Sequence, residues 1–224
     1  GSVANTYPNK GSYTSIKFDP NTANKFVVAH QDYGASDHGY VQLGTVSGTS
    51  ITLATAVVFN SSVTEYISIA FDPNTTGKFV VAYRDGGNSN YGTAILGTLS
   101  GSSISFGTEV AFTGDATYIA IAFDPINTGK FVVAYREMVV AGYGDAKVGT
   151  LSGTSLSFGS ANRFDSAGAN NISIAFDGVT SGKFVVAYSA SANSQKGTAV
   201  LGQIATTIDV TNLTTTNFLG TSTA

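Results

Sequence analysis

Four aspartates recur in one sequence context and are the first candidates for chemistry. Asp19, Asp72, Asp124 and Asp177 each follow a phenylalanine and precede Pro or Gly. Four such carboxylates could form a ring of metal ligands, but no Asp-x-Asp-x-Asp calcium loop accompanies them. An Asp-Pro pair is typical of a turn in which the carboxylate accepts backbone N–H groups. We therefore expect the aspartates to stabilise turns, and we predict no metal site and no cofactor.

Four lysines follow the aspartates at a constant distance. Lys25, Lys78, Lys130 and Lys183 each begin a run of β-forming residues. They could gather around an anion or pair with the aspartates across the turn. We favour the pairing, which would contribute little if it is exposed to solvent.

The two histidines offer only a weak constellation for catalysis. His38 follows Asp37 and could act with it as acid and base, but the sequence has no Gly-x-Ser-x-Gly context for a nucleophilic serine. His30 stands where the other copies of the same phrase have tyrosine. We expect His30 to fill a packing position.

Two acids at equivalent positions could serve as paired carboxylates for glycoside hydrolysis. Asp85 and Glu137 need only meet in space to do so. The alternative is that they are solvated charges at a rim, beside Arg84 and Arg136. We favour the alternative and predict that the protein is not an enzyme.

Internal repeats position all of these residues. The phrase occurs as IKFDPNTANKFVVAHQD, IAFDPNTTGKFVVAYRD, IAFDPINTGKFVVAYRE and IAFDGVTSGKFVVAYSA, with phenylalanines 53, 52 and 53 residues apart. A second phrase, LGTLSGSSISFG and its variants, keeps the same interval. The sequence therefore predicts one repeat domain over 1–224, with units at about 14–65, 66–117, 118–171 and 172–218.

Each unit contains four runs of β-forming residues, which we designate A to D. In the second unit they span 66–71, 78–84, 93–99 and 103–112. The A–B turn requires a left-handed residue, supplied by Gly77 and, in the first unit, by Asn24. Strand B, KFVVAY, is apolar on both faces, as expected for a strand packed between two neighbours. The fold class predicted is all-β: a β-propeller of about four four-stranded blades from 52–53-residue repeats, with a β-helix as the rival.

The number of D strands leaves the closure of the ring open. A strand at about 3–7 resembles a fifth D strand, and 205–224 is an eroded tail that contains the fourth. Either the N-terminal strand completes the last blade, or the chain comes from a longer array. In the second case open blade edges would allow a homo-oligomer.

Composition excludes several partners. Only 11% of the 224 residues are charged and the net charge is -3, which argues against nucleic acid. Cysteine is absent, so there are no disulfides or thiolate metal sites. No apolar run reaches the roughly 20 residues that span a bilayer, so we predict no membrane insertion.

The loops of each unit differ in a way that points to function. The A–B and C–D turns are nearly identical between copies, whereas the B–C and D–A loops differ in content and, for B–C, in length. Scaffolds keep a framework constant and vary the loops that recognise ligands. The phenolic, amide and charged side chains there suit a glycan or a cell-surface receptor. The candidate ligand-binding residues are Asp32, Tyr33, His38, Arg84, Asp85, Asn88, Tyr91, Arg136, Glu137 and Tyr143.

The phrasing FDPNTxGKFVVAY…GTLSGTSISFG resembles repeat arrays in tail-fibre and adhesin-like proteins of marine phages and bacteria. The resemblance covers residues 14–218, and the tail VTNLTTTNFLGTSTA is similar to the start of a further module. It implies surface attachment, outside the cell or on a virion. A non-enzymatic adhesion module is thus the expected function, with a structural spacer of a fibre or a glycoside-active enzyme as alternatives.

Overall fold

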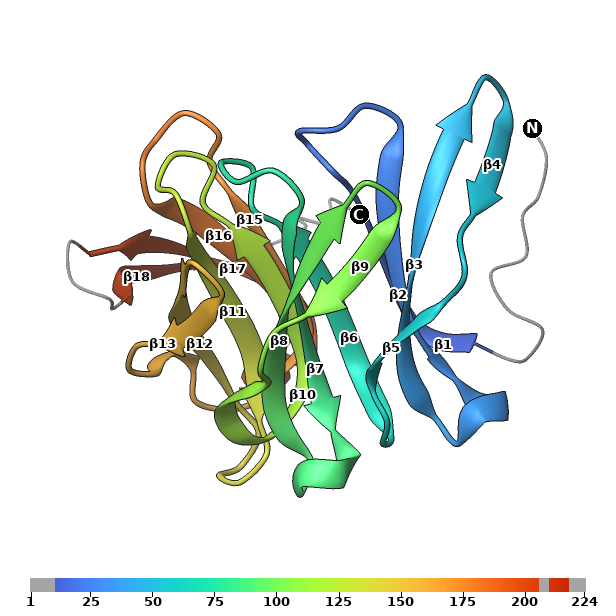
Figure 1. Cartoon of the computed structure of the whole chain (residues 1–224). Helices are drawn as coiled ribbons and strands as arrows, with labels where there is room; N and C mark the ends of the chain where they lie inside the picture. Colours follow the sequence, from blue (N-terminus) through green and yellow to red (C-terminus); the bar gives the residue numbers. More distant parts are fainter. Residues whose placement is uncertain (1–10, 206–209, 218–224) are drawn as a thin grey trace, which may run out of the picture.

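The computed structural model describes residues 11–205 and 210–217, which form four antiparallel sheets in a row, the second and third of which are joined by one long shared strand (Figure 1). Sheet 1 contains β1 (Gly11–Phe18), β2 (Lys25–Asp32), β3 (His38–Ser47), β4 (Ser50–Leu53) and β5 (Val57–Asn60). Sheet 2 contains β6 (Thr64–Phe71), β7 (Lys78–Asp85), β8 (Tyr91–Ser100), β9 (Ser103–Phe106) and the first part of β10 (Val110–Phe123). Sheet 3 contains the rest of β10, β11 (Lys130–Glu137), β12 (Tyr143–Ser152), β13 (Ser155–Phe158) and β14 (Asn162–Asp165). Sheet 4 contains β15 (Ala169–Phe176), β16 (Lys183–Ala190), β17 (Lys196–Ile204) and β18 (Val210–Asn217).

The all-β prediction is confirmed, and strands A, B and C lie where the sequence indicates. Strand D differs, because in sheets 1 to 3 it is broken into two short strands. In sheet 2, β9 pairs with the end of β8, and β10 resumes the pairing near the start of β8. The break lies at 107–109, so the single run expected over 103–112 is wrong.

The connection between sheets 2 and 3 also differs from the prediction. The expected D–A loop TGDATY is part of β10, which pairs first with β8 and then with β11. The repeat interval that contains this connection is 52 residues instead of 53. The connection between sheets 2 and 3 is therefore one residue shorter than the others. It has no room for a separate loop, and the strand passes directly from one sheet to the next.

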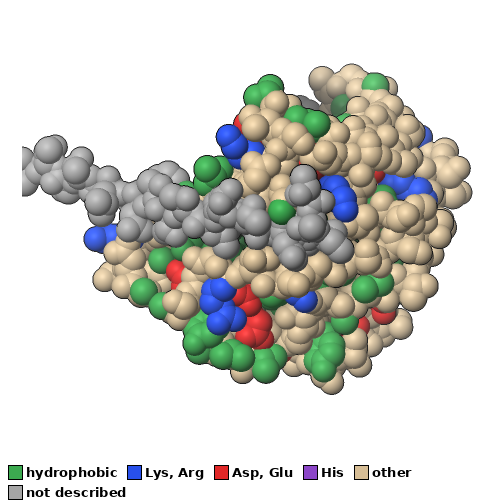
Figure 2. Space-filling model, turned by 90° about the vertical axis from the view of Figure 1, so that its left-hand side faces the viewer, with side chains coloured by type: hydrophobic (Ala, Val, Ile, Leu, Met, Phe, Trp, Pro, Cys, Tyr) green, Lys and Arg blue, Asp and Glu red, His purple; other side chains and the backbone are tan. Residues whose placement is uncertain are grey.

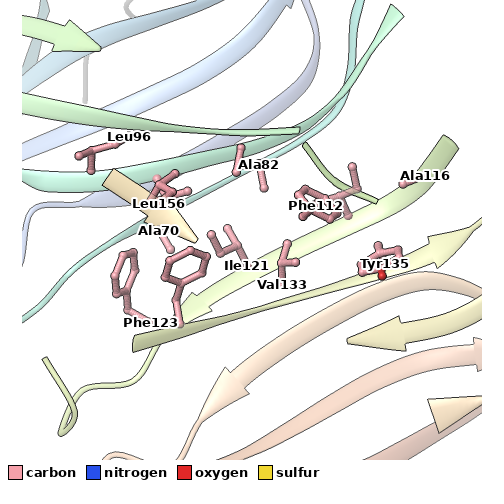
Figure 3. Close-up of a cluster of buried hydrophobic side chains, with 14 residues drawn as sticks. Ala70, Ala82, Leu96, Phe112, Ala116, Ile121, Phe123, Val133, Tyr135 and Leu156 are labelled. Atoms are coloured by element: carbon pink, nitrogen blue, oxygen red, sulfur yellow. The ribbon is translucent and has the colours of Figure 1, made fainter. Parts of the chain in front are cut away.

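Strand B lies between two sheets, as its two apolar faces predict. Val80 packs in the cluster between sheets 2 and 3, and Val81 packs in the cluster between sheets 1 and 2. Both are fully buried. Figure 3 shows the first of these clusters, in which Leu96 and Ala82 face Ile121 and Val133 across the junction. Each junction therefore has its own apolar core, which fixes the position of one sheet relative to the next.

The A–B and C–D turns gather at one end of the sheets, here named the turn end, which is at the top of Figure 1. Gly77 and Asn24 have φ of 70° and 63°, which confirms the left-handed position in both units. The Asp72 Oδ1 atom accepts the backbone N–H of Asn74 at 2.9 Å, so the aspartates do stabilise turns.

The expected pairing of lysine with aspartate is wrong for Lys25, Lys78 and Lys130, whose Nζ atoms donate to Gly101 O, Thr98 Oγ1 and Thr150 Oγ1 instead. In the fourth unit the pKa of Asp177 is lowered by hydrogen bonds from Thr180 and Val179 and, to a smaller extent, by the charge of Lys183.

Neighbouring turns are also tied to one another. The Asn74 side chain donates to the backbone oxygen of Asp124 in the next sheet, at 3.4 Å. The repeated phrase is thus a structural framework, both within a unit and between units.

The first strands β1, β6, β10 and β15 pack side by side in chain order. Sheets 1 and 4 stand on opposite sides of the molecule, with sheets 2 and 3 between them (Figure 1). Within the described residues the row is open and no strand pairing closes it into a ring. The expected closing strand at 3–7 lies outside the described residues. Strand β18 pairs with β17, so residues 210–217 of the eroded tail belong to sheet 4.

Candidate functional site

The B–C and D–A connections form the opposite end of the sheets, here named the loop end. All four B–C loops have five residues: 33–37, 86–90, 138–142 and 191–195. The difference in length expected from the sequence is therefore wrong. It arises because the ends of strands B and C cannot be located from the apolar pattern alone. The copies differ only in the side chains that a common loop carries.

The loop backbone is also shared. Each loop ends with two successive residues of positive φ, such as Ser89 at 55° and Asn90 at 64°. Left-handed residues other than glycine are uncommon, so their repetition shows that all four loops end in one conformation. The equivalent pairs are Ser36 and Asp37, Ala141 and Gly142, and Ser194 and Gln195. Three of the loops begin with a 3-10 helix, at Tyr33–Ala35, Gly86–Asn88 and Ser191–Asn193, whereas the loop at 138–142 does not.

Acids at the end of strand B hold three of these loops. Asp32 Oδ1 accepts the Gly34 N–H at 2.8 Å, and Asp85 Oδ1 accepts the Gly87 N–H at 3.0 Å. The Glu137 carboxylate accepts two backbone N–H groups of its own loop, at 2.7 and 2.9 Å. Asp85 and Glu137 are 4% and 8% exposed, so the expectation of solvated rim charges is wrong. They position the loops.

A hollow of about 500 Å³ opens at the loop end between sheets 1 and 2. The end of β5 and the D–A connection form one wall, and the loop after β7 forms the other. Its lining residues are Val58, Phe59, Asn60, Ser61, Ser62, Asp85, Gly87, Asn88 and Glu109.

Two carboxylates in this hollow are held in fixed orientations. Asn60 Nδ2 donates to Asp85 Oδ1 at 3.0 Å, which links sheet 1 to sheet 2. The hydroxyl of the buried Tyr83 donates to Glu109 Oε1 at 2.7 Å. Burial, then the hydrogen bond to Glu109, raises the pKa of Tyr83 far above its ordinary value, so this phenol remains a donor. The Phe59 ring packs edge-on against Tyr83 and is 5% exposed, so the apolar part of the hollow comes mainly from the 41% exposed Val58 beside it.

The narrowest contact in the hollow requires a glycine. A Cβ atom on Gly87 would lie 2.3 Å from Ser62 Oγ. The loop of sheet 2 can therefore approach the D–A connection of sheet 1 only because this residue has no side chain.

A second hollow, of about 320 Å³, occupies the equivalent place between sheets 3 and 4. Phe164 and Asn193 line it at the positions of Phe59 and Asn88. Its carboxylate comes from the opposite wall, because Asp165 replaces Asn60 and Ala190 replaces Asp85. Asp165 Oδ1 accepts the N–H groups of Ala167 and Gly168, at 2.7 and 2.9 Å. The two hollows thus share one plan with different polar groups.

The junction between sheets 2 and 3 is built differently. A Cβ atom on Gly114 would lie 2.8 Å from Val139 Cγ2, so the Val139 side chain lies against the β10 crossover. Met138, Val139 and Val140 are 41%, 68% and 50% exposed. The loop at this junction therefore presents apolar side chains to solvent.

The two arginines expected to bind a ligand are engaged within the protein. Arg84 forms ion pairs with Glu65 and Asp115, and its Nε lies 2.9 Å from Asp115 Oδ1. Arg136 Nη1 donates to Asn170 Oδ1 at 2.5 Å. Each arginine therefore joins its own sheet to the connection or first strand that follows it.

Of the ten candidate ligand-binding residues, Asp85 and Asn88 are the two that line the first hollow. Tyr33 and Tyr91 are exposed by 52% and 41% outside it, and His38 is half-buried at the start of β3. The Tyr143 ring lies beneath the Arg163 guanidinium, 3.9 Å from the centroid. The structure does not bring these residues together into one site.

A row of tyrosines is the feature that the sequence analysis missed. Tyr13, Tyr66 and Tyr118 have φ of 48–50° at bulges in the first strands. Their rings contact one another along the row of sheets, with centroids 5.1 and 5.4 Å apart and interplanar angles of 45° and 60°. Burial, together with Glu65 and the neighbouring tyrosines, raises the pKa of Tyr13 to about 12. The sequence signal is the tyrosine directly before the alternating Ile-x-Ile-x-Phe pattern of strand A, which breaks that pattern.

The remaining candidates are structural. His30 is 1% exposed, as expected for a packing residue, and burial lowers its pKa to about 4. The described residues contain no group of three or more His, Cys, Asp or Glu side chains arranged to hold a metal ion. Nor does the described part of the chain include a helix of the length and apolarity needed to cross a membrane.

Comparisons with known proteins relate the chain to others by fold. No family model and no curated protein matches the sequence. Among solved structures it is similar to the NanB sialidase from Streptococcus pneumoniae, in complex with 2-[(3-chlorobenzyl)ammonio]ethanesulfonate, with a TM-score of 0.53 and 12% identity. It is also similar to AofleA from Arthrobotrys oligospora, with a TM-score of 0.58 and 9% identity.

Both similarities cover more of this chain than of the other protein. They extend over 75% and 91% of this chain, but over only 26% of the NanB chain and 56% of the AofleA chain. At such low identity they show a shared fold and transfer no residue roles.

Proposed function

We propose that the chain is a non-enzymatic module that binds saccharides in the hollows between neighbouring sheets at the loop end. The observation that carries the proposal is the hollow between sheets 1 and 2, where an aromatic ring lies among polar groups of fixed orientation. The C–H faces of a sugar pack on an aromatic ring, and its hydroxyls require donors and acceptors. Phe59 is 5% exposed and offers only part of its ring, the 41% exposed Val58 offers most of the apolar surface, and Asp85, Asn88 and Ser62 offer the polar groups.

The first hollow contains an oriented carboxylate that can accept a hydrogen bond from a hydroxyl group. Asp85 is oriented by Asn60 and Gly87 through Oδ1, whereas its Oδ2 atom has no hydrogen bond within the described residues. A preorganised acceptor binds a hydroxyl with little further loss of entropy. No Lys, Arg or His is among the residues that line this hollow, and Glu109 adds a second acid. We therefore propose neutral saccharides in preference to sialylated or sulfated ones.

The setting that we propose is surface attachment. The four sheets would be blades of a β-propeller related to repeat arrays of tail-fibre and adhesin-like proteins, outside the cell or on a virion. The similarity to a sialidase fold supports a carbohydrate context. Asp85 and Glu137 belong to successive loops and each holds its own loop, which favours binding over hydrolysis.

An array of neutral and anionic glycans, followed by calorimetric titration of the best neutral one, tests the proposal. Asn88→Ala should weaken binding about 3- to 10-fold, the value of one hydrogen bond. Its melting temperature should not change, because Asn88 is exposed. Ser102→Ala, an exposed change at the turn end, is the matched control. Release of reducing sugar would show an enzyme instead, and the absence of any bound glycan would favour the fibre spacer.

A further inference from the structure

The last sheet in the row exposes apolar side chains whose equivalents are buried. Val185 in β16 is 42% exposed and Leu201 in β17 is 40% exposed. At the same positions in sheet 3, Val132 and Val148 are fully buried against sheet 4. We name Val185 and Leu201 the trailing face. Figure 2 views the molecule from the side on which sheet 4 lies, where hydrophobic side chains (green) are scattered among polar ones.

The first sheet exposes apolar side chains on the opposite side of the molecule. Ile16 and Phe18 in β1 are 52% and 58% exposed. Their pairing partners in β2, Val28 and Phe26, are each 4% exposed, so the exposed apolar surface on this side belongs to β1. The equivalents of the two β1 residues in sheet 2, Ile69 and Phe71, are 0% and 6% exposed because they pack against sheet 1. We name Ile16 and Phe18 the leading face.

Each internal junction joins these same two surfaces. Between sheets 1 and 2, Ile69 and Phe71 share one cluster with Val27 and Leu43. Val27 and Leu43 stand at the positions of Val185 and Leu201 in the repeat. The trailing face of sheet 4 is therefore the kind of surface against which a leading face packs.

We propose that the trailing face of one copy packs against the leading face of a second copy of this chain. Sheets 1 and 4 of one chain lie on opposite sides of the row, so its own two faces do not meet (Figure 1). A second copy supplies the missing partner surface. Its leading face is equivalent in the repeat to the surface that packs against the preceding sheet at each internal junction. The contact joins two different surfaces, so association produces a closed ring or an extended assembly, depending on the rotation per copy.

Light scattering after size-exclusion chromatography, over a wide range of protein concentrations, measures the assembly. The wild type should have at least twice the 22.9 kDa mass of one chain. Val185→Asp together with Leu201→Asp should abolish association, and so should Ile16→Asp, because each places a charge in an apolar contact. Val179→Asp, at an 87% exposed turn residue away from both faces, should change nothing.

Mixing the two defective variants distinguishes this contact from any other. The double variant keeps its leading face and the Ile16 variant keeps its trailing face, so an equimolar mixture should form a complex of two chains. Circular dichroism and melting confirm that each variant is folded, and Leu201→Lys replaces the double variant if that one unfolds. A wild type of single-chain mass at every concentration would overturn the proposal, whether a terminal segment covers the faces or the ring closes on itself. Association of either variant alone, or failure of the folded mixture to associate, would also overturn it.

Discussion

Gly97→Ala tests how closely the repeats are packed. Gly97 lies in strand β8 beneath the ring of Phe79, and a Cβ atom there would lie 2.1 Å from Phe79 Cζ. The ring cannot move away, because Phe79 is fully buried and contacts the rings of Phe71 and Phe106. The substitution must therefore push the ring or strand β8 out of place.

The expected loss follows from the size of this overlap. Overpacking a rigid core costs about 1–3 kcal/mol, and in a chain of this length each kcal/mol lowers Tm by about 2–4 °C. We expect Gly97→Ala to lower Tm by about 3–10 °C. The same contact recurs under Phe26, Phe131 and Phe184, with Cβ distances of 2.0 to 2.2 Å, so the other three sites should behave alike.

Thermal and denaturant unfolding of purified variants provide the measurement. Gly178→Ala is the matched control, since a Cβ atom there meets nothing within 4 Å, and it should be neutral or slightly stabilising. Replacing Phe79 with Leu in the Gly97→Ala background should cost less than the sum of the two single changes, because the smaller side chain relieves the overlap. A Gly97→Ala protein as stable as the wild type would refute the packing described for the repeats.

Three further predictions follow from single residues. Val81→Asp should unfold the domain, which loss of the β-sheet circular dichroism signal would reveal, because an unpaired charge buried between sheets 1 and 2 costs several kcal/mol; a soluble variant with unchanged melting would contradict this. Arg84→Ala should destabilise the protein by about 1–3 kcal/mol in denaturant titrations, since it breaks the contacts of Arg84 with Asp115, and Arg84→Lys should recover only part of that loss. Burial lowers the pKa of His30 to about 4 from 6.5. As the pH falls, the unfolded chain therefore binds a proton at His30 at a higher pH than the folded protein does. The stability that His30 contributes is therefore complete above pH 6.5 and is lost as the pH falls towards 4, by about 3 kcal/mol, and His30→Tyr should remove this component from the pH profile.

The framework of the fold could be predicted from the sequence because the same pattern of residues occurs in four repeats. Asn24 stands in the first unit where the second unit has Gly77, which indicated a left-handed residue at this turn position. Both residues have the left-handed conformation. The two apolar faces of strand B predicted neighbours on both sides, and Val80 and Val81 have them. These features are local or periodic, so they can be read without knowing how the sheets meet.

The candidate site was harder to predict because it lies between sheets. Asn60 and Asp85 belong to neighbouring units, and the hydrogen bond between them depends on the placement of two sheets. Arg84 looked like a free loop charge because Asp115, its partner, is 31 residues away in the β10 crossover. Contacts between side chains that are far apart in the chain cannot be recognised from a single sequence.

The common loop backbone limits how recognition can differ between junctions. The two left-handed residues hold the conformation in every loop, and an acid at the end of strand B also holds it in three of the four, whereas Ala190 makes no such hydrogen bond. The left-handed positions are therefore not free to vary with the ligand. Asn88 and Asn193 do not hold the loop conformation, and they line the two hollows. Binding should therefore differ between hollows through a few exposed side chains and through the wall that supplies the carboxylate, Asp85 in one hollow and Asp165 in the other. Two related sites of unequal affinity on one rigid row would bind a branched or repeating saccharide more tightly than either site binds one sugar, provided that the ligand spans both.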